Sequence, residues 1–144
     1  MGKFYEAACA ELEVYIRHLA WLNATPDGDK ISRFDWFEAN GYEAVYPDCD
    51  ADYILTYLQE IGMSLGEQPL NFSEINAYQN VTGIDLQSWE ARIIKRLSVA
   101  YLSELANARS PDRESAWDDA PRYMHVSYMK SMKAKASIRR LTKE

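Results

Sequence analysis

Three acidic residues alternate in the sequence PDCDADY, at Asp48, Asp50 and Asp52. The first ligands of a calcium-binding loop have this spacing, because alternate side chains can turn toward one ion. A loop starting at Asp48 would also need glycine at its sixth position and glutamate at its twelfth, but Tyr53 and Gln59 stand there. The pattern therefore favours a turn in which Asp50 or Asp52 caps a helix. We predict no metal ligands in this chain.

Two histidines, His18 and His125, are the other candidates for acid or base chemistry. Neither has a nucleophile or an orienting carboxylate at a familiar spacing. The motifs of nucleotide-binding loops, zinc proteases and α/β-hydrolases are absent from the sequence. We therefore predict no catalytic residues, no cofactor and no enzymatic activity. A metal-dependent enzyme built on the Asp48 to Asp52 cluster stays open as an alternative.

The charge of the chain is divided between an acidic body and a basic tail. Residues 1–120 hold 21 acidic and 9 basic residues, whereas residues 121–144 hold one acidic and seven basic residues. An acidic body repels a phosphate backbone, so nucleic-acid binding could come only from the tail and is not our expectation. We expect the tail to be solvated or to lie on its own acidic body.

The sequence predicts no membrane partner. No apolar run reaches the roughly 18 residues that a bilayer-spanning helix needs. Glutamates at positions 6, 11 and 13 interrupt any signal-peptide core. We expect a cytoplasmic protein.

Apolar residues recur at spacings of three and four along most of the chain, which is typical of amphipathic helices. The sequence predicts a mainly α protein, with about five helices in one small domain and a basic amphipathic C-terminal tail. We expect an acidic helical domain at 1–110, a polar linker at 111–121 and a tail at 122–144 that is helical or partly disordered. We assign no element to residues 41–50, where a short two-stranded piece is one alternative.

The strongest pattern lies between Pro69 and Leu102. Asn71 precedes Glu74 by three residues, as in a capping box, and Gly83 is suited to end the helix that Asn71 starts. Asp85 is the expected cap of the next helix, which keeps helical spacing for five turns.

Partner contact is the role we expect for a few residues in the linker and the tail. Trp117 stands in the acidic linker, either exposed as an anchor for a partner or packed back on the helices. Met124, Tyr128 and Met132 would share one face if the tail were a continuous helix, and methionine packs around varied shapes. These four residues form our candidate partner-binding set.

The stretch from Pro69 to Leu102 resembles tail assembly chaperones of long-tailed (siphovirus-like) bacteriophages. In that family a short helix beginning Pro-Leu leads through Thr-Gly and Trp-Glu into a longer helix. The scaffold residues of the motif in this chain are Glu74, Tyr78, Gly83, Trp89 and Tyr101, accompanied by Pro69, Leu70, Ile75, Ala77, Thr82, Leu86, Glu90, Leu97, Ser98, Ala100 and Leu102. Asn71 departs from the Ser or Thr common in the family, but either type can cap a helix.

The resemblance implies a small, non-enzymatic helical phage protein of the bacterial host cytoplasm. It implies binding to the tape-measure protein during virion tail assembly, and self-association is compatible with that role. The alternative partner is a host or bacterial-defence protein with a basic surface that meets the acidic body. Tail-mediated nucleic-acid binding is a further alternative.

Overall fold

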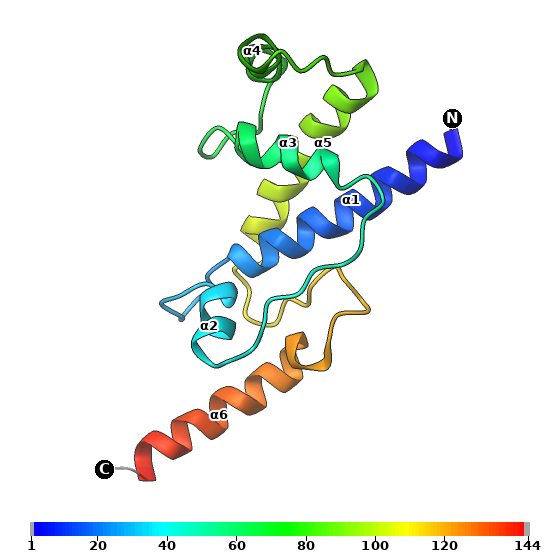
Figure 1. Cartoon of the computed structure of the whole chain (residues 1–144). Coiled ribbons are helices and arrows are strands. Elements are labelled where there is room, and N and C mark those ends of the chain that lie inside the picture. Colours follow the sequence, from blue (N-terminus) through cyan, green and yellow to red (C-terminus); the bar gives the residue numbers. More distant parts are fainter. Residues whose placement is uncertain (1, 143–144) are drawn as a thin grey trace.

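The protein, seen here as a computed structural model that describes residues 2–142, is built of helices joined by loops (Figure 1). Within those residues there is no β-strand, and the prediction of a mainly α protein is confirmed. The elements in chain order are α1 (Gly2–Asn23), α2 (Arg33–Ala39), α3 (Tyr53–Ile61), α4 (Phe72–Thr82), α5 (Ser88–Asn107), the short 3-10 helix η1 (Arg122–Met124) and α6 (Val126–Thr142). The last two residues of the expected tail, 143 and 144, lie outside the described part.

The long helix α1 is the centre of the packing. Its residues Ala8, Leu12, Ile16 and Ala20 lie one turn apart and are all buried, so they form a single apolar stripe. This stripe faces α5, and α3 and α4 pack on α5 in turn. Burial of one leucine or isoleucine side chain stabilises the fold by about 1.5–3 kcal/mol, so the stripe largely fixes the α1 and α5 pair.

The buried apolar residues form two clusters at different levels of α1. The first lies between α1, α3, α4 and α5, and includes Leu12, Ile54 and Ile93. The second surrounds the C-terminal end of α1 and brings Trp21 together with Phe37 of α2 and the segment that follows α5. The tail therefore joins the body at the second cluster.

Residues 41–52 run in an extended path beside α1 without forming a strand (Figure 1). Tyr46 stacks on Tyr15 of α1 with ring centroids 5.4 Å apart, and the Asp50 amide donates to the Glu11 carboxylate at 3.1 Å. Asp52 stands at the N-cap of α3, as predicted, although its side chain makes no capping hydrogen bond. Side chains of α1 hold this segment in place. The residue spacing within the segment could not predict these contacts, because they come from a distant helix.

Candidate partner-binding site

The helix pair α4 and α5 has well-defined ends. The Asn71 side chain accepts a hydrogen bond from the Glu74 amide at 2.9 Å, and Gly83 ends α4 in the left-handed conformation at φ 75°. Both predicted helix ends are confirmed. The predicted cap at Asp85 is wrong, because α5 begins two residues later with Gln87 as its cap. There the Glu90 carboxylate reaches back to accept from the Gln87 amide at 2.9 Å.

Ser98 connects α5 to the loop before α4. Its hydroxyl accepts from the Leu70 amide at 2.9 Å and donates to the Met63 carbonyl at 2.7 Å. The Ser98 and Leu70 side chains are both buried, so no water can replace these bonds without opening the packing. This motif residue thus sets the path of the chain between α3 and α4.

Trp89 and Tyr101 both join α5 to α1. The Trp89 ring meets the Tyr5 ring edge-on at 6.3 Å, and the Tyr101 hydroxyl accepts from the Asn23 amide group at 3.1 Å. These contacts lie near opposite ends of α5. The two aromatic residues therefore fix the orientation of α5 along α1.

Tyr78 joins α4 to α3, because its hydroxyl hydrogen-bonds to the Glu60 carboxylate. Burial, together with the neighbouring carboxylate, raises the pKa of Tyr78 to about 12, so this phenol remains a donor at neutral pH. Glu74 is exposed and contributes through its backbone amide at the start of α4.

The segment after α5 is packed on the body at several points. Arg113 makes a two-point ion pair with the buried Glu104 at 2.8 and 3.0 Å, and its carbonyl accepts from the Trp21 indole at 2.7 Å. The Glu104 hydrogen bond raises the pKa of Arg113. The segment that follows the last turn of α5 is thereby held against the end of α1.

His18 lies at the centre of this packing, fully buried on α1. Its Nδ1 is 2.6 Å from the Ser115 hydroxyl and its Nε2 is 2.8 Å from the Val45 carbonyl. A carbonyl can only accept, so Nε2 carries the proton and Nδ1 accepts from Ser115. Burial lowers the pKa of His18, which favours the neutral ring. The Trp117 ring meets this imidazole edge-on at 5.1 Å, so the half-buried Trp117 is packed back on the body.

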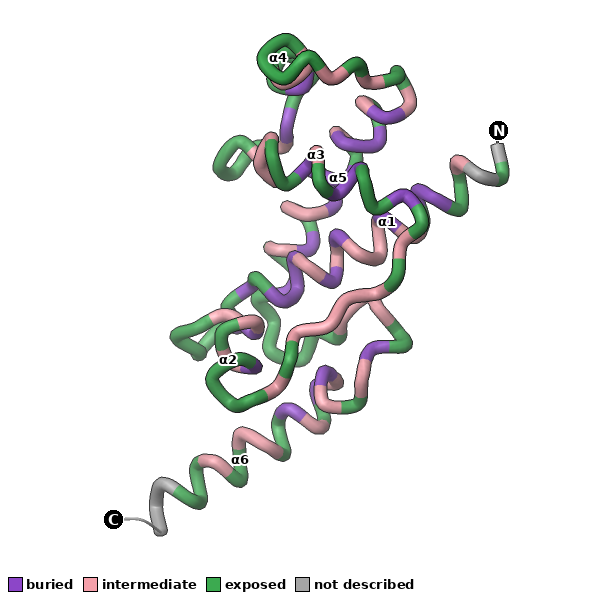
Figure 2. The backbone as a smooth tube through the Cα atoms, viewed as in Figure 1, coloured by how far each residue is buried: buried purple, intermediate pink, exposed green. Residues whose placement is uncertain are grey.

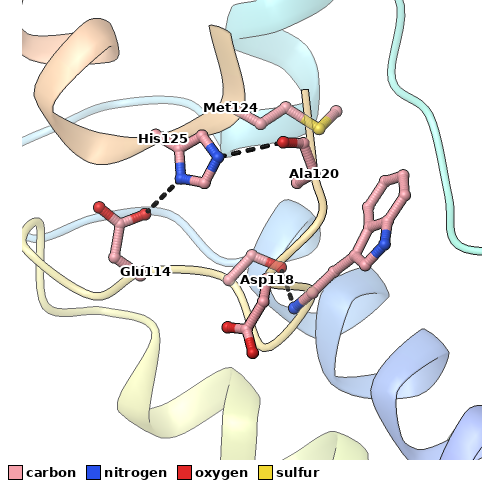
Figure 3. Close-up of a pocket in the computed structure, with 7 residues that line it drawn as sticks. Glu114, Asp118, Ala120, Met124 and His125 are labelled. Carbon is pink, nitrogen blue, oxygen red and sulfur yellow. Dashed lines mark hydrogen bonds and ion pairs between the residues drawn. The ribbon is translucent and has the colours of Figure 1, made fainter. Parts of the chain in front are cut away.

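A small cavity of about 110 Å³ lies where this segment meets the tail (Figure 3). Glu114 accepts from the Val126 amide at 3.1 Å, which places a carboxylate at the start of α6. His125 points between Glu114 and the carbonyl of Ala120 (Figure 3), at 3.7 and 3.0 Å. This arrangement fixes the start of α6.

The four candidate partner-binding residues differ in their exposure. Met124 lies in η1 and is only 1% exposed, whereas Trp117, Tyr128 and Met132 are half-buried. The prediction that Met124 shares a helix face with Tyr128 and Met132 is wrong, because α6 begins only at Val126. A partner contact at Met124 would require η1 to leave the second cluster.

Two buried charged residues near the second cluster, Arg33 and Glu104, were not predicted from the sequence. Arg33 is 2% exposed, and Glu104 is buried with Arg113 as its partner. Glu104 could have been found, because it falls on the apolar face of α5 between Tyr101 and Ala108. Nothing local marks Arg33, since its hydrogen-bond partners come from distant segments.

Within residues 2–142 no group of three metal-ligating side chains comes together. No helix in that range is both long enough and apolar enough to cross a membrane. The aromatic rings, methionines and ion pairs of this region pack the linker and the start of α6 on the body.

Comparison with known proteins finds similarity over one segment of the chain. No curated protein and no solved structure shows significant similarity to the chain. One family model does match, over residues 50–103, which cover α3, α4 and most of α5. The resemblance seen between Pro69 and Leu102 is thereby confirmed and extends upstream through α3. Residues 50–103 carry the pattern of the family described as phage tail assembly chaperone.

Proposed function

We propose that this protein is a tail assembly chaperone that binds the tape-measure protein of its phage and acts without catalysis. The observation that carries the proposal is the family match over residues 50–103. In the structure those residues form three helices whose motif side chains act in capping and packing. A scaffold of this kind suits a protein that holds a partner.

The distribution of exposed apolar side chains supports the same role. Among the described residues, seven large apolar side chains are exposed, and five of them lie between residues 50 and 103. They are Tyr53, Leu65, Phe72, Val81 and Val99, with Val81 at 86% exposure. Single exposed apolar residues are common on any protein surface, so their exposure alone does not mark a binding site. We interpret them as partner contacts because they fall within the family match.

We propose that the linker and tail take part in partner contact through Trp117, Met124, Tyr128 and Met132. The half-buried Tyr128 and Met132 can be reached by a partner with little rearrangement. Trp117 and Met124 become available only when the tail moves. The flexible methionine side chains suit a helical partner whose surface varies along its length.

The experiment is co-expression of the full chain with the tape-measure protein encoded by the same phage. The proposal predicts soluble tape-measure protein that co-purifies with the chain. A Y128S/M132S variant should lower the co-purified amount at least fivefold. The matched control is S127A/S131A, since both serines are exposed on α6. Equal recovery with both double variants would contradict the tail contact.

A further inference from the structure

Helix α6 packs on the body through its first turns. Val126 and Met129 are 8% and 5% exposed, and Met132 and Lys133 are half-buried. Beyond Lys133 the residues are mostly exposed, and α6 projects away from the rest of the molecule (Figure 2). Because most of these later residues are exposed, they add little buried apolar surface to the anchoring of α6, and such an element opens easily.

The docked part of α6 is basic, and the surface beneath it has an acidic rim. Lys130 pairs with Asp112, and the Lys133 ammonium lies 2.8 Å from the Asp29 carboxylate. The same ammonium lies 5.4 Å from the centre of the Trp36 ring. Exposed ion pairs contribute about 0–1 kcal/mol each, so these pairs select a basic helix without holding it firmly.

The apolar packing under α6 is incomplete. A pocket of about 190 Å³ lies beside Val126 and Met129 of the helix and Pro26 and Pro111 of the body. Four charged side chains complete its lining: Asp29, Arg33, Lys130 and Lys133. A water molecule takes up roughly 30 Å³ in the liquid, so the gap is several waters in size. The side chains around it therefore have no protein atoms packed against them on that side. A helix with bulkier apolar residues at these positions would fill the surface better than α6 does.

We propose that this surface, formed by Pro26, Asp29, Arg33, Pro111 and Asp112 and here called the tail-docking surface, binds a basic amphipathic helix of the partner protein. In the free chain α6 occupies the surface and must be displaced. The partner helix would carry two basic residues three positions apart, as Lys130 and Lys133 are, beside large apolar residues. The inference rests on the proposed function for the identity of the partner.

Displacement would also free the methionines of α6. Met129 and Met132 pack on the second cluster in the free chain. Once α6 has moved, these side chains and the surface they covered are both open to a long helical partner. The α6 helix thus lowers the apparent affinity for the partner, because it competes from within the same molecule at a high effective concentration.

The first experiment uses a fluorescently labelled peptide of residues 122–142 and measures its anisotropy on adding the full chain. The wild type should bind it weakly, because its own α6 competes. The K130E/K133E chain should bind it at least tenfold more tightly, since its altered tail is repelled by Asp29 and Asp112. Adding D29K/D112K to that chain restores attraction to its own tail and should abolish binding. Equal binding to wild type and K130E/K133E, or binding to neither, would overturn the proposal.

The second experiment repeats the titration with the tape-measure protein. The K130E/K133E chain should bind it more tightly than wild type, and the 122–142 peptide should compete. Equal affinity without competition would overturn the inference and leave the proposed function standing. Loss of all tape-measure binding with peptide binding intact would instead refute the proposed function. A wild-type dimer that K130E/K133E dissociates would make the occupant a second copy's α6 and overturn the partner assignment.

Discussion

The Arg33 guanidinium donates a hydrogen bond of 2.7 Å to the carbonyl oxygen of Ala108, which lies 75 positions later in the chain. The same side chain donates to the carbonyls of Trp21 and Ser110, both at 3.0 Å. The Trp21 and Ala108 carbonyls lie at the C-terminal ends of α1 and α5, where the helix dipoles are negative, and Ser110 lies in the turn after α5. Burial lowers the pKa of Arg33 to about 10, so the group stays charged at neutral pH. One cation therefore joins the ends of the two central helices.

Replacing Arg33 should destabilise the fold strongly. The R33M variant keeps a long apolar stem but leaves three carbonyl groups without their donor, and we expect a loss of about 3 kcal/mol. The measurement is the free energy of unfolding from urea denaturation. The control is R109M, because Arg109 is exposed and its ion-pair partner, Asp27, is exposed as well. This account would be contradicted if R109M lowered the unfolding free energy by more than about 1 kcal/mol, or if R33M lowered it by less than about 1 kcal/mol.

Ser98 provides a test of the motif itself. The S98A variant removes the acceptor for the Leu70 amide, which is buried, and the donor for the Met63 carbonyl, which is partly buried. Each unpaired buried group costs about 1–3 kcal/mol, so we expect a loss of at least 1.5 kcal/mol in unfolding free energy. Ser103 lies on the exposed face of the same helix, and S103A should be neutral or slightly stabilising. Equal effects of S98A and S103A would show that the hydroxyl plays no special part.

His18 should make stability depend on pH. Its folded pKa is lower than the ordinary value near 6.5, so the unfolded chain binds a proton first as the pH falls. The contribution of neutral His18 to the unfolding free energy is therefore fully present above the unfolded pKa. As the pH drops from the unfolded pKa to the folded pKa, this contribution decreases by at most about 1.4 kcal/mol per pH unit. The groups around the ring, Trp21, Tyr46, Trp117, Ser115 and the Val45 carbonyl, include no carboxylate that would stabilise an imidazolium.

The measurement compares unfolding free energies at pH 7 and pH 5.5, above the range in which most carboxylates titrate. The H18Q variant lacks the titrating group and should show a smaller fall over this interval than the wild type. A wild-type fall no larger than that of H18Q would show that His18 does not titrate differently in the two states.

Much of the helical framework follows from local patterns. Spacings of three and four residues predict the helices. Asn71 marks the start of α4 because its side chain accepts a backbone hydrogen bond, and Gly83 marks the end because glycine readily adopts the left-handed conformation. Asp85 failed as a cap because Glu90 reaches back to Gln87 and starts α5 later. Local spacing cannot weigh one such contact against another.

The surroundings of the tail could not be predicted in the same way. Trp117 meets His18, and Arg33 meets Ala108, only after the whole chain has folded. Met124 leaves the expected helix face because η1 follows Pro121 and α6 starts afresh at Val126. For the first turns of α6, the expectation that the basic tail lies on its own acidic body is confirmed, because Lys130 pairs with Asp112 and Lys133 pairs with Asp29.

The central claim is that the protein binds the tape-measure protein of its phage. The most direct measurement is the affinity of the purified full chain for that protein, determined by isothermal titration calorimetry beside a basic host protein of similar size. Our account predicts saturable binding to the tape-measure protein that persists at 0.5 M salt, because apolar contacts should dominate. Absence of such binding, with salt-sensitive binding to the host protein in its place, would contradict it.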